Sequence, residues 1–220
     1  MSAAGNAQPV SPPFALPPER EARRLRRGLA QPPPAAARFV LGQVLVRRVG
    51  RRAIAVRIVE TEAYLGADDP AAHAYRGRTA RTEPLWGPPG TIYVYLIYGM
   101  HHCLNLSADR AGAPGCVLIR AAEPLPGSGL EPQDCRGPGR LCRSLELDTR
   151  HSGLSVFARG SGLFLREGEP PARVATSARV GITKAAEREL RYYDAASAAV
   201  SGRGRPRARK AGLTGPRTPQ

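Results

Sequence analysis

A succession of short apolar runs, separated by polar or glycine-containing turns, is the feature that most constrains how this chain folds. Well-defined runs lie at 39–46, 53–59, 91–98, 103–106 and 116–122, and weaker ones follow at 162–165 and 174–182. Their length and their β-branched and aromatic residues are typical of β-strands. Strands in succession with few helices favour an α+β fold: a single domain built on a mostly antiparallel or mixed β-sheet with a few short helices.

The segments between these runs predict the remaining elements. The first two runs flank a Gly-Arg-Arg turn at 50–52 and so predict a β-hairpin. Short helices are expected at Glu19–Leu29, before the proline run at 32–34, and at 140–147, where a proline precedes the entry. The segment 184–193 is expected to mix a helical turn with a strand. An arginine-rich loop at 67–89 is longer than a simple connection requires, which indicates a functional loop.

Composition suggests three regions along the chain. Residues 1–34 are expected to be a disordered leader followed by a short basic segment, because their first 18 residues carry no charged side chain. Residues 35–202 hold the apolar runs and are expected to form the folded domain. Residues 203–220 contain six Arg or Lys and no acid, which predicts a basic disordered tail.

The net charge is +15, from 33 Lys and Arg against 18 Asp and Glu. Such a balance suits a polyanionic partner, because each phosphate neutralised by a basic side chain releases condensed counterions. A compositional bias toward arginine would give the same number. Charge alone therefore favours a nucleic acid or an anionic surface only slightly.

The four cysteines are spaced irregularly, at positions 103, 116, 135 and 142, and contain no C-x-x-C pair. We therefore expect reduced thiols and no metal site. The N-terminus has no apolar leader segment, and no stretch approaches about 18 consecutive apolar residues. These observations predict a cytoplasmic protein, nucleoid-associated in a bacterium, with no membrane partner.

The densest cluster of candidate chemical groups follows the second apolar run, where Glu60, Glu62 and Tyr64 alternate along the chain. Side chains alternate in a strand, so both carboxylates should project to the same face. Two carboxylates beside an aromatic ring could supply a general base with a raised pKa. Taken alone, the segment fits an ordinary strand end with solvated acids better, because such ends commonly carry glutamate.

Other polar and aromatic residues allow two interpretations. Tyr93 and Tyr95 share one strand face, which is typical either of a packed half-buried surface or of a platform on which a base stacks. His73 is a lone loop histidine, a kind that is usually solvent-exposed. Asn105 and Arg120 lie inside apolar runs, where polar groups are usually hydrogen-bonded for structural reasons. None of these residues decides the function by itself.

Their order along the chain is more informative, because it resembles the alkyladenine (3-methyladenine) DNA glycosylase family, the mammalian-type alkylpurine glycosylases and their bacterial relatives. The matching segments are VETEAYLG at 59–66, DDPAAH at 68–73, PGTIYVYLIYGM at 89–100, CLNL at 103–106, VLIRAAEPL at 117–125, GPGRLC at 137–142 and ARVGI at 178–182. The resemblance covers residues 35–202, roughly three-quarters of the chain, and an ordered set of segments is far more specific than one short motif.

The resemblance implies an enzyme, a monofunctional DNA-3-methyladenine glycosylase. By residue matching, Glu62 is the general base that deprotonates a water for attack on C1′ of a flipped nucleotide, and Arg120 helps to place this water. The implied substrates are 3-methyladenine, 7-methylguanine, hypoxanthine and ethenoadenine. The only lysines are Lys184 and Lys210, and neither matches a pocket position, so no Schiff-base lyase step is expected. No cofactor is implied.

The resemblance also assigns the residues that hold the flipped base. Tyr64, His73 and Tyr95 match the residues that stack on it, which suits an electron-poor methylated purine. Tyr98 and Met100 match the wedge that fills the gap left in the duplex.

Two further matches concern base choice and DNA contact. Asn105 matches the residue that clashes with the exocyclic amine of normal guanine, and Arg140 matches a basic residue that is a candidate phosphate contact. The sequence departs from the family pattern at His101 and His102, where aromatic residues are common, and in the loop at 82–88.

The expected partner is double-stranded DNA with a damaged purine, bound by a monomer. The main alternative is a non-catalytic nucleic-acid-binding module on the same fold, which would have no need of a carboxylate at position 62. A small-molecule enzyme that uses Glu60 and Glu62 as acid and base is a third interpretation, but it leaves the positive charge and Tyr98 unexplained.

Overall fold

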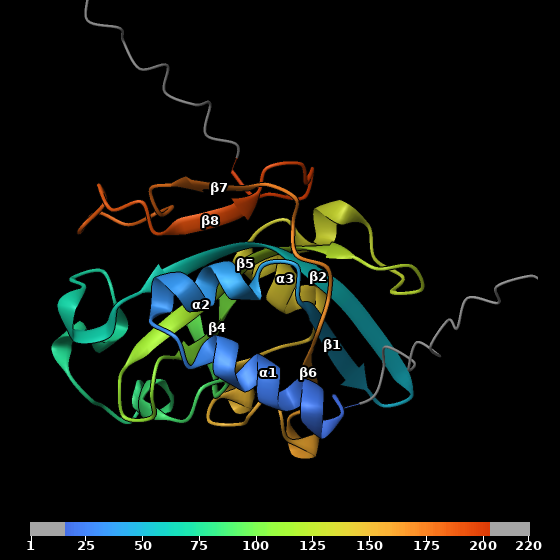
Figure 1. Ribbon diagram of the computed structural model, residues 1–220, viewed down its shortest axis with the longest axis horizontal. Coiled ribbons are helices and arrows are strands. Elements are labelled where there is room, and N and C mark those ends of the chain that lie inside the picture. Colours follow the sequence, from blue (N-terminus) through green and yellow to red (C-terminus); the bar gives the residue numbers. More distant parts are fainter. Residues whose placement is uncertain (1–15, 203–220) are drawn as a thin grey trace, which may run out of the picture.

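A computed structural model describes residues 16–202, and its ribbon is drawn in Figure 1. One antiparallel sheet organises this part of the chain. Its strands are β1 (Val44–Val49), β2 (Arg52–Tyr64), β3 (Ile92–Ile97), β4 (His101–Ala108), β5 (Gly115–Pro124), β6 (Leu163–Arg166), β7 (Val174–Ser177) and β8 (Arg191–Asp194). The main path runs β3-β4-β5-β2-β1-β6, and every strand pair in the described residues is antiparallel. The predicted α+β single domain is confirmed, and the sheet is antiparallel rather than mixed.

Strand β2 is the longest strand and connects most of the sheet. Its first half pairs with β1, its second half pairs with β8, and β5 runs along its other edge. The pairing with β5 shifts register between Ile58 and Glu60 and again between Glu60 and Thr61. Such a bulge bends a strand and redirects its side chains. Beyond it, Thr61 Oγ1 donates a hydrogen bond to the carbonyl of Ala37 in helix α2, on the side away from the two glutamates.

Three helices pack on the sheet: α1 (Glu19–Leu29), α2 (Pro33–Val40) and α3 (Pro138–Ser144). In Figure 1, α1 and α2 lie in blue in front of the strands, while β7 and β8 form an orange ribbon above β2. Helix α3 packs against β4 and β5. Leucines of α1 and α3, and one leucine directly after α2, belong to the same hydrophobic core cluster as the sheet. They are fully or almost fully buried: Leu25, Leu29, Leu41 and Leu141.

The prediction of a strand over 39–46 was wrong in its first half. The three prolines at 32–34 begin a helix, because proline is well suited to the first helical turn, and the alanines that follow extend it to Val40. Gly42 then adopts a φ of +84°, and a Cβ there would lie 2.2 Å from the carbonyl oxygen of Glu169. Only glycine fits this turn, so the strand begins at Val44.

Helix α1 confirms the helix expected at Glu19–Leu29. Its inner face buries Ala22, Leu25 and Leu29, while its arginines lie on the outer face. The helix belongs to the same core cluster as the sheet. The boundary expected at residue 35 is therefore not visible as a break in the packing, and the packed body includes residues from 19 onward.

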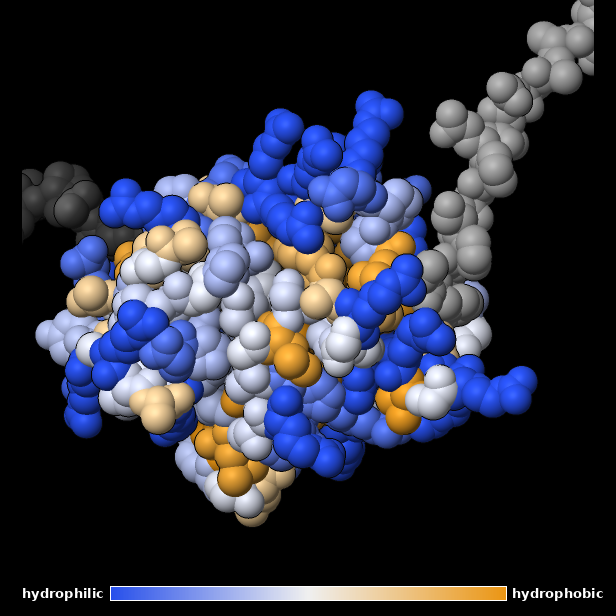
Figure 2. Space-filling view, turned by 90° about the horizontal axis from the view of Figure 1, so that it is seen from below, coloured by the Kyte–Doolittle hydropathy of each residue, from blue (hydrophilic) through white to orange (hydrophobic). Residues whose placement is uncertain are grey.

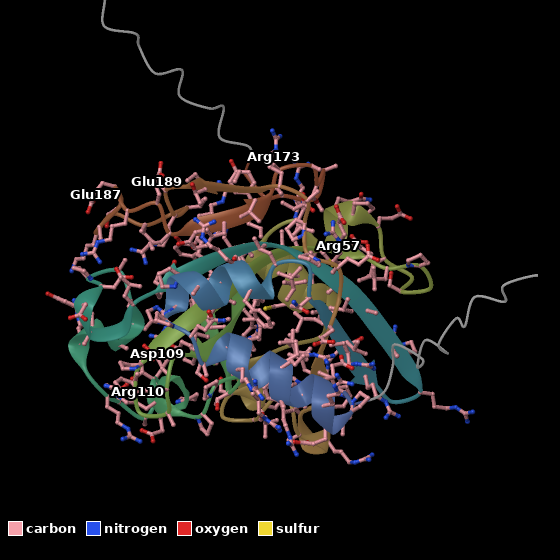
Figure 3. All side chains as sticks on the ribbon, in the orientation of Figure 1. Arg57, Asp109, Arg110, Arg173, Glu187 and Glu189 are labelled. Atoms are coloured by element: carbon pink, nitrogen blue, oxygen red, sulfur yellow. The ribbon has the colours of Figure 1, made fainter. Side chains whose placement is uncertain are left out.

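The loops and the weaker runs follow the predictions in outline. The loop at 67–89 holds short 3-10 turns at His73–Arg76 and Glu83–Trp86, and a similar turn at Gly66–Asp68 leads into it. The helix expected at 140–147 begins two residues earlier and ends at Ser144. Within 174–182 only β7 forms, and the segment 184–193 contributes β8 but no helix. Glu187 and Glu189 lie on the connection between these two strands, at the edge of the molecule (Figure 3).

Surface and termini add two observations. The face seen in Figure 2 is largely hydrophilic, and its hydrophobic residues form separate patches. None of the helices in the described residues is long and apolar enough to cross a membrane. The disorder predicted for the first residues of the leader and for the tail concerns residues 1–15 and 203–220, which lie outside the described part of the chain.

Candidate active site

A pocket of about 1150 Å³ opens between the β3–β4 pair, the loop at 67–89 and the start of α3. Most of the site residues predicted from the sequence line it. These are Tyr64, His73, Tyr95, Tyr98, Asn105, Arg120 and Arg140. Glu62 lies directly behind this lining, in contact with Tyr64 and Arg120. Met100 lies beyond the rim, on the same β3–β4 turn as Tyr98.

Glu60 and Glu62 are both fully buried, so they are not the solvated strand end that the segment alone favoured. The guanidinium of Arg120, on β5, lies between them. Its Nε donates to Glu60 Oε1 at 3.0 Å, and its Nη1 lies 3.3 Å from Glu62 Oε1. Glu60 at the bulge and Glu62 two residues later thus direct their carboxylates to one side, where one arginine from the neighbouring strand reaches both.

The two carboxylates have different surroundings. Glu60 accepts hydrogen bonds from Arg191 Nε at 2.6 Å, from Arg120, and from both the backbone N–H and the hydroxyl of Ser201. Its oxygens are therefore saturated by protein groups. Glu62 accepts one bond per oxygen, from the Tyr64 hydroxyl at 2.9 Å and from the Val180 N–H at 2.8 Å. Of the two, Glu62 retains the capacity to accept a further proton donor.

Burial also changes the acidity of Glu62. Desolvation raises its pKa above the usual range, because the low-dielectric interior disfavours the charged form. The positive charge of Arg120 and the hydrogen bonds from Val180 and Tyr64 oppose this effect only in part. A carboxylate with a raised pKa takes up a proton more readily than a surface glutamate, which is the property required of a general base.

Three aromatic rings form one wall of the pocket. The ring centroids of His73 and Tyr95 lie 4.4 Å apart at an interplanar angle of 74°, and Tyr93 lies 5.7 Å from Tyr95 at 31°. His73 Nδ1 also makes a hydrogen bond with the Tyr93 hydroxyl at 2.9 Å. Tyr93 was not predicted as a site residue, although its shared face with Tyr95 was the available signal. Two of the stacking residues predicted from the sequence, His73 and Tyr95, therefore lie against each other, and the third, Tyr64, lines the same pocket.

The surroundings of His73 favour its neutral form. Burial lowers its pKa below the usual value, and the nearby positive charge of Arg81 lowers it further. The pocket wall therefore consists of neutral rings, which attract an electron-poor ring without adding a positive charge of their own.

Asn105 lies on β4 beside this aromatic wall and is nearly fully buried. Its Nδ2 donates to the carbonyl of Tyr93 at 3.1 Å, and its Oδ1 lies 3.9 Å from the thiol of Cys116. The amide is thus held at both ends while it lines the pocket. Cys116, which sequence reasoning did not single out, lines the pocket next to it.

The end of β3 and the β3–β4 turn carry exposed apolar side chains. Tyr98 is 80% exposed, Met100 70% and Leu96 44%, although all three are large hydrophobic residues. Tyr98 has a φ of +53°, in the left-handed region that costs a non-glycine residue about 1 kcal/mol or more. This strained turn displays the Tyr98 side chain to solvent beside the pocket mouth.

Basic side chains surround the same opening. Arg81, Arg136, Arg140 and Arg143 all line it. Arg140 is exposed at the beginning of α3, and Nη1 makes one contact, of 3.4 Å, with the carbonyl of Gln133. The rim is therefore positively charged and able to contact phosphate groups.

Sequence reasoning missed three charged residues that hold the site together. Arg191 binds Glu60, and Arg179 forms a buried ion pair with Asp69. Asp69 and Arg179 lie in segments that carry the family resemblance, which was the available signal. For Arg191 no local pattern pointed to a role.

The cysteines and candidate metal ligands complete the description. All four cysteines are free and buried. Burial raises the pKa of Cys116 to about 12 and that of Cys135 to about 11, so these thiols are protonated at neutral pH. Among residues 16–202, no group of three or more His, Cys, Asp or Glu side chains is arranged to hold a metal ion.

Comparison with known proteins supports the family resemblance. A sequence model of the methylpurine-DNA glycosylase family matches residues 27–198. Similar proteins with the provisional name 3-methyladenine DNA glycosylase occur in Methanocella arvoryzae, with 42% identity over 76% of this chain and 90% of that protein, and in Koribacter versatilis, with 46% identity over 78% and 89%. A protein of the same name in Myxococcus xanthus is 46% identical over 70% of this chain and 78% of its own length.

The matched region contains both buried glutamates, the basic rim and the pocket lining except Gly202, and the family match covers more than half of the chain. The chain therefore belongs to the methylpurine-DNA glycosylase family and is a DNA glycosylase, a hydrolase that acts on N-glycosyl bonds.

Proposed function

We propose that the protein removes alkylated or deaminated purines from double-stranded DNA, with Glu62 as the general base that activates a water. The class includes 3-methyladenine, 7-methylguanine, hypoxanthine and ethenoadenine. The observation that carries the proposal is the buried Glu62 carboxylate, held behind the pocket wall by Tyr64 and Val180 with its pKa raised.

The reaction begins when the damaged nucleotide leaves the duplex and enters the pocket. Tyr98, exposed on its strained turn, fills the gap in the base stack, with Met100 beside it. The purine then stacks against Tyr64, His73 and Tyr95, whose neutral rings suit an electron-poor base. Unstacking costs a few kcal/mol and is least costly for damaged bases, which contributes to selectivity.

Hydrolysis follows in one displacement. A water molecule transfers a proton to Glu62 while its oxygen bonds to C1′, and the bond between C1′ and the purine nitrogen breaks. The electron pair of that bond leaves with the purine, so a cationic methylpurine becomes the neutral free base, and a neutral purine leaves as an anion that takes up a proton from solvent. The other product is an abasic sugar with a hydroxyl at C1′. Arg120, 3.3 Å from Glu62, helps to place the water and limits the rise in the pKa of the carboxylate.

Two further residues determine how DNA and base fit. We expect the amide of Asn105 to oppose the exocyclic amine of normal guanine, because it lines the pocket and is held at both ends. We expect Arg140, which lies at the rim, to contact a DNA phosphate.

We propose that the enzyme is monofunctional, because a lyase step needs an amine that reaches C1′. The described lining of the main pocket contains no lysine, and Lys184 lines a neighbouring hollow of about 480 Å³ instead. We further propose that it acts as a monomer on nucleoid DNA in the cytoplasm, because one protein molecule is sufficient to bind one lesion.

The test is release of free base from a duplex with one hypoxanthine or ethenoadenine, for the wild type and Glu62→Gln, without added metal. Glutamine keeps the shape of the side chain but removes the base. Release by the wild type alone, with lesion binding retained in the variant, supports the proposal. Equal release by both proteins would remove Glu62 from its role. No release by either protein, on these or on methylated duplexes, would favour a binding module without catalysis.

A further inference from the structure

A second buried ion pair lies next to Tyr64, and the reaction described above does not use it. The side chains of Asp69 and Arg179 are both fully buried. Arg179 Nη2 donates to Asp69 Oδ1 at 2.9 Å, and Nη1 donates to Asp69 Oδ2 and, at 3.0 Å, to the carbonyl of Ala63. This two-pronged contact fixes the guanidinium in one orientation.

The pair is anchored to the surrounding backbone. Asp69 also accepts the N–H groups of Leu65, at 3.2 Å, and Ala71, at 3.1 Å, so its carboxylate remains charged although it is buried. Arg179 Nε is buried without a hydrogen-bond partner in the described structure. Asp69 is the one carboxylate in ion-pair contact with this guanidinium among the described residues.

The guanidinium lies over the ring of Tyr64, with its Cζ 4.6 Å from the ring centroid. Tyr64 lines the pocket and Arg179 does not, so the ring separates the guanidinium from the space where a base would stack. The face of an aromatic ring attracts cations. A guanidinium without a neutralising carboxylate behind the ring would weaken the attraction of the Tyr64 ring for a cation. It would also repel a positively charged base on the pocket side.

We propose that Asp69 is a specificity-determining positioning residue, whose carboxylate neutralises Arg179 behind Tyr64 and thereby allows the pocket to bind cationic purines as well as neutral ones. The inference rests on the proposed function, because it concerns the base that stacks on Tyr64. The distinction is chemical: a purine methylated at N7 of guanine carries a positive charge in the nucleotide, whereas hypoxanthine does not.

The expected size follows from the geometry. A base stacked about 3.5 Å in front of the Tyr64 ring lies roughly 8 Å from the guanidinium carbon. With an effective dielectric constant of about 20, repulsion between two unit charges at that distance lowers affinity by roughly tenfold to thirtyfold. The positive charge leaves the purine as the glycosidic bond breaks. The loss should therefore fall on binding more than on the maximal rate.

A structural role for the pair would have a different signature. Arg179 directly precedes Val180, whose N–H donates to Glu62, so distortion of this segment would weaken excision of every lesion. The ratio of the half-saturating enzyme concentrations for a cationic and a neutral lesion would then stay constant. The ratio is consequently the quantity that separates charge compensation from simple support.

The experiment compares duplexes with one 7-methylguanine or one hypoxanthine under single-turnover conditions, for the wild type and Asp69→Asn. We expect the half-saturating enzyme concentration to rise tenfold to thirtyfold more for 7-methylguanine than for hypoxanthine. The double variant Asp69→Asn/Arg179→Gln, which removes both charges, should return the ratio to that of the wild type. Arg179→Lys, which keeps the charge, is the matched control and should leave the ratio unchanged.

An unchanged ratio in Asp69→Asn, or a changed ratio that the double variant does not restore, would overturn the inference. If circular dichroism shows that Asp69→Asn is unfolded, Arg179→Gln is measured in its place. This variant keeps the negative charge of Asp69 and should favour binding of 7-methylguanine over hypoxanthine. An unchanged ratio of half-saturating enzyme concentrations, or a change that favours hypoxanthine, would refute the inference. Release of neither base by the wild type would instead refute the proposed function.

Discussion

Tyr64 is expected to set the pH at which the enzyme becomes active, and Tyr64→Phe tests this directly. The substitution keeps the aromatic ring and removes only the hydroxyl, which donates to Glu62 Oε2 at 2.9 Å. That hydrogen bond stabilises the charged form of Glu62 and lowers a pKa that burial raises. Its loss should raise the pKa of Glu62 further. The general base is active only when deprotonated, so the acid limb of the activity profile should move to higher pH.

The magnitude follows from the strength of the bond. A hydrogen bond to a charged group contributes about 1.5–3 kcal/mol and a neutral one about 0.5–1.5 kcal/mol, so the carboxylate loses about 1–1.5 kcal/mol relative to the carboxylic acid. This difference corresponds to roughly a tenfold lower rate on the acid side of the profile. On the alkaline side of the limb, the rates of variant and wild type should converge to a constant ratio.

The assay is single-turnover release of hypoxanthine from a duplex across the acid and neutral pH range. Tyr95→Phe is the matched control, because it removes a hydroxyl from another ring of the same pocket, and no hydrogen bond joins that hydroxyl to Glu62. An acid limb at the same pH in the wild type and Tyr64→Phe would refute the assignment of this limb to Glu62. An equal displacement in Tyr95→Phe would point to a general change in the pocket.

Three further predictions concern stability and DNA distortion. Glu60→Gln should lower the free energy of unfolding by about 3–5 kcal/mol in chemical denaturation, because it leaves Arg120 and Arg191 facing each other without their shared carboxylate; a loss below 1 kcal/mol would contradict this. Glu62→Gln should raise the melting temperature at pH 7. The pKa of Glu62 in the folded state lies above its unfolded value, so ionisation of Glu62 lowers stability as pH rises. The gain should disappear below about pH 4, and a lower melting temperature at pH 7 would argue against it. Tyr98→Ala should leave the melting temperature unchanged, because this side chain is 80% exposed, and should weaken lesion affinity and flipping; equal weakening on a duplex whose lesion is already unpaired would assign Tyr98 to the pocket instead.

Much of the fold could be predicted because strand formation depends on local pattern. Alternating and β-branched runs identified the central strands of the sheet, and alternation correctly directed Glu60 and Glu62 to one side. The run at 39–46 was misread, since apolar composition is the same in a buried helix end and a strand. The prolines before it and Gly42 within it determined the outcome.

The ordered motifs of the sequence also indicated the family and seven of the residues that line the pocket, but not Tyr93 or Cys116. It did not determine how the two glutamates differ. Besides Arg120, the groups that saturate Glu60 come from Arg191 and Ser201, more than 130 residues along the chain, and the pairing of β8 with β2 brings them close. The ion pair between Asp69 and Arg179 likewise joins residues 110 positions apart.

A local pattern reports which side chains share a face, because that depends on backbone geometry within a few residues. Acidity and charge compensation depend on desolvation and on partners within a few ångströms, which distant segments supply. The sequence therefore indicated many of the residues that meet in the site, but not Asp69, Arg179 and Arg191, which hold it together. Only the tertiary structure decided that the oxygens of Glu60 are saturated by their partners, whereas each oxygen of Glu62 accepts one hydrogen bond.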